Sequence, residues 1–457
     1  MNSRAVRPTP LWWRDATGVA TWASLLVVLA LWTAHRGVQD LGRTPAESLD
    51  SLGRLTGLLS ADLLLIQVLL MARIPWVERS YGQDELARRH RWVGFASFDL
   101  LVAHIVAITM GYAAGDSRGV WSELWRFITV YPGMLLATAG TVALILVVVT
   151  SVRLARARLR YESWHLLHLY AYLGVGLSVP HEIWTGSDFT VSRVAGLYWW
   201  GLYLAAAGAT LLFRVGLPVW RTLHHAPVVS HVVEEAPGVV SVHLTGRNLH
   251  RLPARAGQFF LWRFRDGPGW TGANPYSLSQ APDGQTLRIT AKDLGDGSGR
   301  LSTLPAGTRV LLEGPYGRLT GDGRKRRKVT MLASGIGITP MRSLLEELDY
   351  RPGDATLIYR ARDEESIVFR DELDELADRR GVHVVYLPGH RVAGRQSWLP
   401  ASAGHLRDDA ALRRLVPDIG QQDVFICGPD AWMEAARRAA RSAGVPSRHI
   451  HLERFTW

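Results

Sequence analysis

Four histidines lie within or at the ends of long apolar stretches of the sequence, where an ionisable side chain is costly. His90 and His104 are 14 positions apart in one stretch, and His168 and His181 are 13 apart in another. Such a residue usually faces the interior of a helix bundle and has a partner there. At roughly 1.5 Å of rise per residue, each pair spans about 20 Å. The sequence therefore predicts two levels of histidine inside a bundle.

Six stretches are long and apolar enough to cross a bilayer as helices, for which about twenty residues are needed. They are residues 16–34, 55–72, 92–113, 130–152, 164–184 and 194–213. The connections on one side, counted with the segment before the first stretch and with Arg214 and Arg221 just after the last, hold fourteen arginines, against six on the other side. Because cytoplasmic loops are arginine-rich, we expect a multi-pass protein of the cell membrane with both termini in the cytoplasm.

Both histidine-bearing stretches then start on the cytoplasmic side, so His90 and His168 share an inner level, and His104 and His181 share an outer level. One neutral imidazole from each of two helices at each level can hold two stacked haems through axial nitrogens. A zinc site would need its ligands at a single level. We predict these four histidines as the metal ligands of two b-type haems.

The second histidine pair is less regular than the first. A spacing of 14 residues keeps both side chains within about 40° on a helix, whereas 13 residues separate them by about 140°. Pro180, directly before His181, is a plausible source of a kink that re-aims one of them. The sequence "WHLLH" also offers His165 in place of His168, and we prefer His168 because it matches the depth of His90.

The second half of the chain has short β-rich runs in place of the long apolar stretches of the first half. Short β-rich runs separated by Pro and Gly turns predict a small antiparallel barrel over residues 228–325. From 326 to 457, strand and helix patterns alternate, which is typical of a parallel α/β domain. The fold class is therefore multidomain: a six-helix transmembrane bundle over 1–215, then the barrel, then the α/β domain.

A glycine-rich turn in "ASGIGITP" follows the first strand of the α/β domain. Gly335 and Gly337 would let the backbone approach a pyrophosphate, and the next helix would offer free N–H groups. The net charge of +11 suits an arginine-rich membrane face. We interpret the basic run "GRKRRK" as a solvated loop and expect no nucleic-acid partner. Cys427, the one cysteine, excludes an intramolecular disulfide.

Taken together, "NPYSLS", "ASGIGITP", "CGP" and the ending "IHLERFTW" resemble the ferredoxin-NADP reductase module, and the apolar half resembles the ferric reductase transmembrane domain. The whole chain resembles the ferric reductase and NADPH oxidase superfamily. The resemblance implies binding sites for FAD and for NADPH or NADH.

Site residues are implied where the motifs match. In "NPYS", Asn274 and Pro275 would border the flavin, Tyr276 would pack on its ring and Ser277 would bond near its reactive N5. Asn274 stands where the family often has Arg or His, and a neutral amide cannot neutralise a phosphate. The remaining flavin and nucleotide contacts implied by the family are Gly299, Leu301, Ser302, Gly335, Gly337, Thr339, Pro340, Gly428 and Glu453.

The reacting centre implied by the family includes Cys427, beside the nicotinamide, and an aromatic residue near the C-terminus. Phe455 would cover the flavin face, and Trp457 is the competing candidate. With Ser277, these are the residues we assign to catalysis. Arg360 and Arg362 follow a strand and could bind a 2′-phosphate bidentately, which slightly favours NADPH over NADH.

The predicted function is electron transfer across the membrane from cytosolic NAD(P)H, through FAD and two haems, to an extracytoplasmic acceptor such as a ferric chelate. Reduction of dioxygen to superoxide is the alternative within the family. Two further alternatives remain: a membrane-anchored flavin reductase confined to the cytosol, and a haem-binding module with a degenerate flavin domain.

Overall fold

The computed structural model describes residues 12–152, 161–190 and 192–453. The chain forms two compact units. The first, which we call the helical unit, comprises Pro10–Tyr81 and Glu85–Arg214, and the second, the C-terminal unit, consists mainly of Val215–Trp457. Each is described separately below.

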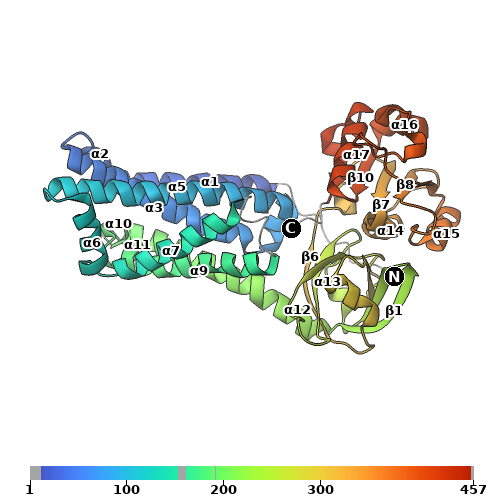
Figure 1. Cartoon of the computed structure of the whole chain (residues 1–457), viewed down its shortest axis with the longest axis horizontal. Coiled ribbons are helices and arrows are strands. Elements are labelled where there is room, and N and C mark those ends of the chain that lie inside the picture. The colour runs from blue at the N-terminus through green and yellow to red at the C-terminus, as the bar shows by residue number, and fades with distance from the viewer. Residues whose placement is uncertain (1–11, 153–160, 191, 454–457) are drawn as a thin grey trace. The chain divides into compact units, whose positions relative to one another are not determined.

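The described part of the helical unit is built from helices (Figure 1). They are α1 (Trp12–Ala34), α2 (Gly37–Asp40), α3 (Pro45–Met71), α4 (Pro75–Tyr81), α5 (Gln83–Gly115), α6 (Val120–Val130), α7 (Met134–Ser151), α9 (Tyr161–Trp184), α10 (Ser187–Thr190) and α11 (Arg193–Ala209). The side chains of Trp22, Trp92 and Leu197 are at least 70% exposed. Apolar side chains on the outside of helices are expected where lipid replaces water as the solvent.

Five helical segments are long and apolar enough to span a membrane by length and composition. They are Trp12–Ala34, Pro45–Met71, Gln83–Gly115, Met134–Ser151 and Arg193–His225. Each of the six predicted stretches coincides with a helix, but α9 is not among these five, so the number of spans is not established by these criteria. Part of the arginine count used for orientation falls on residues 1–11 and 153–160, outside the described residues.

Close contacts and capping hold the helices of the helical unit in place. Helices α7 and α9 lie side by side (Figure 1) because Gly140 and Gly174 face each other: a Cβ on Gly140 would lie 2.7 Å from the Gly174 carbonyl oxygen. The start of α3 is capped by Thr44, whose hydroxyl accepts a hydrogen bond from the Glu47 backbone N–H at 3.1 Å.

The C-terminal unit continues from a π-helical turn (Thr210–Gly216) and α12 (Leu217–His225) into six strands that form two three-stranded sheets. These strands are β1 (Val228–Ala236), β2 (Val239–Thr245), β3 (Phe259–Phe264), β4 (Asn274–Ser277), β5 (Thr286–Lys292) and β6 (Val310–Tyr316). The sheet orders are β1-β2-β5 and β4-β3-β6, both antiparallel. Together they form what we call the β domain.

The two sheets share one apolar core that includes Val242, Phe260, Trp262, Leu278 and Ile289. Single bridges join them, between Val228 and Arg309 and between Leu278 and Ile289. The structure thus resolves the predicted barrel as two linked antiparallel sheets rather than as one continuous sheet.

The following α/β domain contains a five-stranded parallel sheet of order β11-β10-β7-β8-β9. Its strands are β7 (Val329–Ser334), β8 (Ala355–Ala361), β9 (His383–Pro388), β10 (Asp423–Cys427) and β11 (Ile450–Leu452). Its helices include α14 (Ile338–Glu347), α15 (Arg370–Arg380), α16 (Asp408–Leu415) and α17 (Asp430–Ser442). The parallel sheet predicted from the alternating pattern is confirmed.

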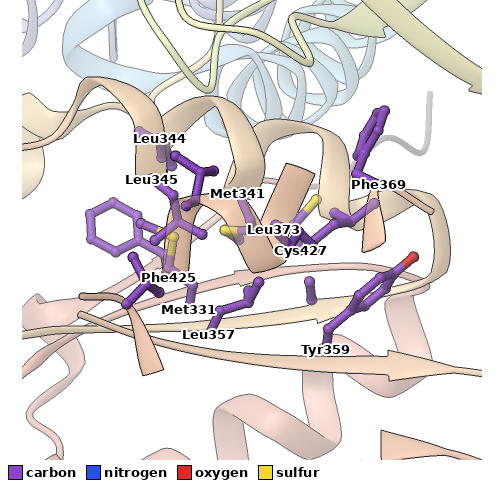
Figure 2. Close-up of a cluster of buried hydrophobic side chains, with 14 of the residues drawn as sticks. Met331, Met341, Leu344, Leu345, Leu357, Tyr359, Phe369, Leu373, Phe425 and Cys427 are labelled. Atoms are coloured by element: carbon purple, nitrogen blue, oxygen red, sulfur yellow. The ribbon is translucent and has the colours of Figure 1, made fainter. Parts of the chain in front are cut away.

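Helices cover both faces of this sheet, so its inner strands β7, β8 and β10 are largely buried on both sides. On one face, Met331, Leu357 and Phe425 from the strands pack against Met341 and Leu344 of α14 (Figure 2). On the other, α16 and α17 enclose a second core (Figure 1). The carboxyl ends of the central strands β7 and β10 therefore lie next to each other at one edge, where ligands bind in open α/β sheets.

The basic run at 323–328 is partly exposed and is also held to the α/β domain by ion pairs and hydrogen bonds. Arg327 pairs with Asp354 at 2.8 Å, and Lys328 pairs with Asp418 at 2.7 Å. The buried carboxylate of Asp423 accepts hydrogen bonds from the backbone N–H groups of Lys325 and Arg326 at 2.8 and 2.6 Å. The charges of this run are thus largely used within the domain.

Candidate functional site: two histidine pairs and a nucleotide edge

The four predicted histidines meet in two pairs, one member from α5 and one from α9 in each. The ring centroids of His90 and His168 are 5.8 Å apart, and those of His104 and His181 are 6.4 Å apart. The rings are inclined at 68° and 47°, respectively. The pairing is the one that the depths along the two helices predicted.

Each ring is oriented by a hydrogen bond at Nδ1. Nδ1 of His104 lies 2.8 Å from the Gly53 carbonyl oxygen, and Nδ1 of His90 lies 3.3 Å from that of Gln67. Because a carbonyl oxygen only accepts, Nδ1 carries the proton in both rings and Nε2 keeps its lone pair. This is the state in which an imidazole ligates a metal, with the second nitrogen fixing its orientation.

The rings from α9 are held by hydroxyl groups. Nδ1 of His168 lies 3.3 Å from Ser151 Oγ, and Nδ1 of His181 lies 2.7 Å from Thr185 Oγ1. Pro180 lies inside α9, directly before His181, as the sequence indicated. The ring of His168, the preferred candidate of the two in "WHLLH", contacts that of His90.

Glycines make room for the outer pair. A Cβ on Gly57 would lie 2.5 Å from Nδ1 of His104. A Cβ on Gly133 would lie 2.8 Å from the backbone nitrogen of His181, and Gly133 has a φ of +80°, which glycine adopts readily. Larger residues at either position would displace a histidine.

The predicted flavin strand is β4, an edge strand of the β domain's second sheet, where it pairs with β3. Trp262 Nε1 donates a 3.0 Å hydrogen bond to the Tyr276 carbonyl oxygen, which fixes the strand against β3. Burial raises the pKa of Tyr276 to about 12, so its phenol stays neutral. Ser277 is 4% exposed, and its hydroxyl has no hydrogen-bond partner within the described part of the chain.

The second predicted flavin segment contains a short helix, α13 (Asp296–Gly299), and a 3-10 turn (Arg300–Thr303). A Cβ on Gly297 would lie 3.0 Å from Asn274 Oδ1, so this segment approaches the start of β4 closely. Leu301 is buried in the core of the β domain, and Ser302 donates a 2.8 Å hydrogen bond to the Gly299 carbonyl. Leu301 therefore contributes its side chain to packing.

The nucleotide loop lies at the carboxyl end of β7. Gly335 has a φ of +54°, and a Cβ on Gly337 would lie 2.3 Å from the carbonyl oxygen of Cys427 at the end of β10. A Cβ on Gly428 would lie 2.9 Å from Ser334 Cβ. The two glycine-containing loops are thus in contact, with no space for side chains between them.

Thr339 and Pro340 begin the helix that follows the nucleotide loop. Both are buried, and the Thr339 hydroxyl donates a 3.0 Å hydrogen bond to the Ile336 carbonyl. Pro340 lacks a backbone N–H, which costs nothing in the first turn of a helix. These two residues form the helix start and leave N–H groups at the edge of the sheet.

Cys427 and Glu453 lie close together behind this edge. Burial, followed by the charge of Glu453, raises the pKa of the Cys427 thiol, so the thiol remains protonated. The Glu453 carboxylate accepts hydrogen bonds from the backbone N–H groups of Arg318 and Leu319, at 2.9 and 3.3 Å. It thus links the C-terminal segment to the β domain. Phe455 and Trp457 lie outside the described residues.

A cavity of about 250 Å³ lies between the β domain and the α/β domain, beside the nucleotide loop. Its lining includes Lys292, Gly335, Arg362, Asp363 and Ser366. The sequence pointed to Arg362 but not to Lys292, which comes from the end of a strand in the other domain. No local motif marks such a residue.

Arg360 does not line this cavity with Arg362. It is 5% exposed, and its guanidinium donates hydrogen bonds to the carbonyl oxygens of Ala361, Leu387 and His390. These carbonyls lie at and beyond the ends of β8 and β9. The side chain of Arg360 therefore holds the edge of the sheet together.

Comparisons with known proteins support both halves of the chain. Residues 56–179 match the family model of the ferric reductase like transmembrane component, and residues 331–438 match that of the oxidoreductase NAD-binding domain. The chain is 34% identical over 199 residues to ferredoxin–NADP reductase B of Sorangium cellulosum, which covers 41% of this chain and 80% of that protein. Through its C-terminal half the chain belongs to the ferredoxin–NADP reductase family, and this module is joined to a ferric reductase like transmembrane component.

Other known proteins are also similar to the C-terminal half. The ferredoxin reductase component of 3-ketosteroid-9-alpha-monooxygenase from Mycolicibacterium smegmatis is 32% identical over 237 residues, 50% of this chain and 64% of that protein. A solved ferredoxin NADP+ reductase from Neisseria gonorrhoeae, with bound FAD and NADP, is 21% identical with a TM-score of 0.40. It covers 50% of this chain and 96% of that chain. The family assignment rests on the sequence matches.

These matches identify the chain as a membrane-associated, NAD(P)H-dependent flavin oxidoreductase of the ferredoxin–NADP reductase type. Its transmembrane component is of the ferric reductase kind.

Proposed function

We propose that the protein passes electrons from cytosolic NAD(P)H across the cell membrane to an extracytoplasmic acceptor such as ferric iron, by way of FAD and two b-type haems. When bound, the flavin takes a hydride from the nicotinamide and releases single electrons, which the haems carry through the membrane. The chain's own residues hold, orient and shield these groups.

The observation that carries the proposal is the spacing within the two histidine pairs. Metal–imidazole bonds of about 2 Å on both sides of an iron atom would separate two ring centroids by roughly 6 Å. The observed separations are 5.8 and 6.4 Å. Each pair is therefore spaced so that it could hold one haem iron, His90 and His168 at the inner level and His104 and His181 at the outer.

The flavin site is supported by Ser277. A buried hydroxyl without a partner is costly, so a ligand atom that bonds to it would satisfy the group. Ser277 is such a group on the strand where the flavin N5 is expected. Gly297 has no side chain and so can lie close to Asn274, whose amide would bond a phosphate without neutralising its charge.

The cavity beside the nucleotide loop supports NADPH as the donor. Arg362 and Lys292 bring two positive charges to its lining, and a guanidinium binds a phosphate bidentately. Asp363 and Glu365 also line it, and Asp363 accepts a hydrogen bond from the Ser366 backbone N–H at 2.8 Å. We assign 2′-phosphate binding to Arg362 and Lys292, and a structural role to Arg360.

In this proposal the chain crosses the membrane six times, with both termini in the cytoplasm. Helix α9 would be the remaining span; its histidines, Pro180 and Glu182 reduce its apolar character while supplying polar groups to the bundle. Ser178 and Tyr203 both donate hydrogen bonds to Glu182, so this carboxylate is not left without partners.

Optical spectra of the purified protein in detergent test the proposal. We expect two haems per chain, reducible by NADPH in the presence of FAD. His168→Leu should remove one haem, whereas His165→Leu, three residues away on the same helix, should retain both. Absence of a Soret band would leave only a flavin reductase anchored in the membrane, and haem reducible by dithionite but not by NADPH would indicate a degenerate flavin domain.

The acceptor is tested on intact cells or oriented vesicles. We expect reduction of an impermeant ferric chelate at the outer face. Superoxide formation at a matching rate, without ferric reduction in anaerobic samples, would instead assign dioxygen as the acceptor.

A further inference from the structure

A single carboxylate connects strand β5 of the β domain to the helix that follows the nucleotide loop. Glu372, on α15 of the α/β domain, pairs bidentately with Arg288 of strand β5, at 2.7 and 2.9 Å. It also pairs with Arg342 of α14, at 2.6 Å from Nε. Bidentate pairs of this kind fix the relative orientation of both groups as well as their distance.

The two arginines meet again on the other side of the carboxylate. Arg288 and Arg342 both donate to the carbonyl oxygen of Ser279, at 3.1 and 3.2 Å. Ser279 follows Ser277, the proposed flavin contact, by two residues. The end of the flavin strand is thus held by one arginine from each domain.

The ion-paired group of Glu372, Arg288 and Arg342 also lies near residues that line the nucleotide cavity. Arg342 follows the loop Gly335–Gly337 by five residues on the helix that this loop begins. The guanidinium of Arg288 lies over the Phe369 ring, 4.7 Å from its centroid, and Phe369 directly follows Val368 of the cavity lining. Phe369 has a φ of +63°, an uncommon conformation for a large side chain.

Charge and burial indicate that this geometry is tightly determined. Arg288 and Arg342 are 5% and 9% exposed. Glu346, which pairs with Arg342 at 2.6 Å and accepts from the Ala281 N–H at 2.8 Å, provides the second negative charge. Two arginines and two glutamates are thereby balanced. Buried ion pairs contribute little net stability but can specify one arrangement over others.

We propose that Glu372 is a positioning residue that sets the approach of the nicotinamide to the flavin. By holding Arg288 and Arg342 in one geometry, it fixes the β domain relative to the nucleotide loop. This inference rests on the proposed function, because it assumes that a nicotinamide and a flavin react between these two domains. A misplacement of about 1 Å between reacting groups can slow a reaction by about a hundredfold.

The domains have other links that keep them together when Glu372 is neutralised. Glu347 accepts from the Ala256 N–H at 2.9 Å and pairs with Arg255, and Glu453 holds the Arg318 and Leu319 backbone. We therefore expect Glu372→Gln to fold and to bind FAD. The amide keeps the size of the carboxylate and loses its charge.

The test is anaerobic rapid mixing of the full-length, FAD-loaded protein with NADPH, followed by flavin bleaching. Glu372→Gln should slow flavin reduction by NADPH about tenfold to a hundredfold and weaken the long-wavelength charge-transfer absorbance of the stacked rings. Reduction by dithionite, FAD content and melting temperature should stay close to those of the unmodified protein. The matched control is Glu375→Gln on the same helix, whose side chain is 60% exposed and pairs only with Arg379 among the described residues.

Two outcomes would overturn the inference. In the first, NADPH reduces the flavin of Glu372→Gln as fast as that of Glu375→Gln. This would show that the ion pairs of Glu372 do not set the approach of the nicotinamide to the flavin. If Glu372→Gln loses FAD, the same measurement on Arg342→Lys decides, because lysine keeps the charge and removes the planar fork; an unchanged rate there would again refute it. A wild-type protein reduced by neither NADPH nor NADH would instead refute the proposed function itself.

Discussion

Gly57 offers the sharpest test of the outer histidine pair. A methyl group on Gly57 would lie 2.5 Å from His104 Nδ1 and 2.9 Å from Cε1, whereas ordinary contacts begin at 3.4 Å. The imidazole cannot retreat without breaking its 2.8 Å hydrogen bond to the Gly53 carbonyl. Gly57→Ala should therefore push the ring out of the position that faces His181.

The expected size of the effect follows from this overlap. Inserting a methyl group into a packed site costs about 1–3 kcal/mol. If this cost falls on the ligated state, haem affinity at the outer level falls about fivefold to more than a hundredfold. The inner pair contacts Gln67 and Ser151 instead, so its haem should be unaffected.

The assay measures haem per chain and the midpoint potentials of the two haems, before and after incubation with excess haem-free myoglobin as a competitor. We expect Gly57→Ala to lose up to half of its haem, and the redox titration to show one midpoint potential in place of two. Gly176→Ala on α9 is the matched control, because a Cβ there meets nothing within 4 Å. Full haem retention with two unchanged potentials in Gly57→Ala would refute the assignment of His104 as a ligand.

Three further predictions concern other parts of the chain. Arg362→Ala should raise the KM for NADPH about tenfold to a hundredfold, because a hydrogen bond to a charged group is worth about 1.5–3 kcal/mol, and leave that for NADH unchanged; equal effects on both would remove its phosphate role. Asp62 accepts hydrogen bonds from Ser24 and Tyr198 at 2.7 and 2.6 Å, so Asp62→Asn should retain the yield of folded protein in detergent and Asp62→Leu should lower it. Burial, then the charge of nearby groups, lowers the pKa of His243 to about 4, so its contribution to stability is complete above pH 6.5 and disappears as pH falls towards 4. After allowance for solvent screening this contribution is about 1 kcal/mol, and the melting temperature of His243→Gln should depend less on pH over that range; an identical pH profile would contradict this.

The membrane helices were predictable from apolarity, but their ends were not. Helix α3 begins at Pro45, ten residues before the predicted stretch, and its first turns carry Glu47, Asp50 and Arg54. Apolarity marks only the part of a helix that lies in hydrocarbon, whereas this helix continues into a polar region. The threonine before Pro45 and the glutamate at Glu47 were a readable capping signal for its start.

The histidine pairing was predictable because depth along a helix follows directly from residue number. The choice of His168 over His165 depended on how α9 is rotated towards α5, and only the fold determines that rotation. The same limit applies to Arg360 and Arg362. They are two residues apart, but β8 ends at Ala361, so Arg360 stays in the sheet while Arg362 leaves it.

The contacts between domains left no readable signal in the sequence. Glu372 occurs in "RDELDELADRR", a run that resembles any solvated helix face. Its partners are 84 and 30 residues away along the chain, on elements of different type. Such a network depends on how two domains dock, and no local pattern encodes that.

The vertical separation of the two histidine pairs also has an electrical consequence. His90 and His104 are 14 residues apart on one continuous helix, which corresponds to about 21 Å, or roughly two thirds of a hydrocarbon core about 30 Å thick. A full membrane crossing is worth about 2.3 kcal/mol per elementary charge for each 100 mV. With the interior negative, the outward movement of each electron between the two levels would therefore be favoured by about 1.5 kcal/mol per 100 mV. The turnover of the proposed enzyme would be electrogenic, and it would slow as the membrane depolarises.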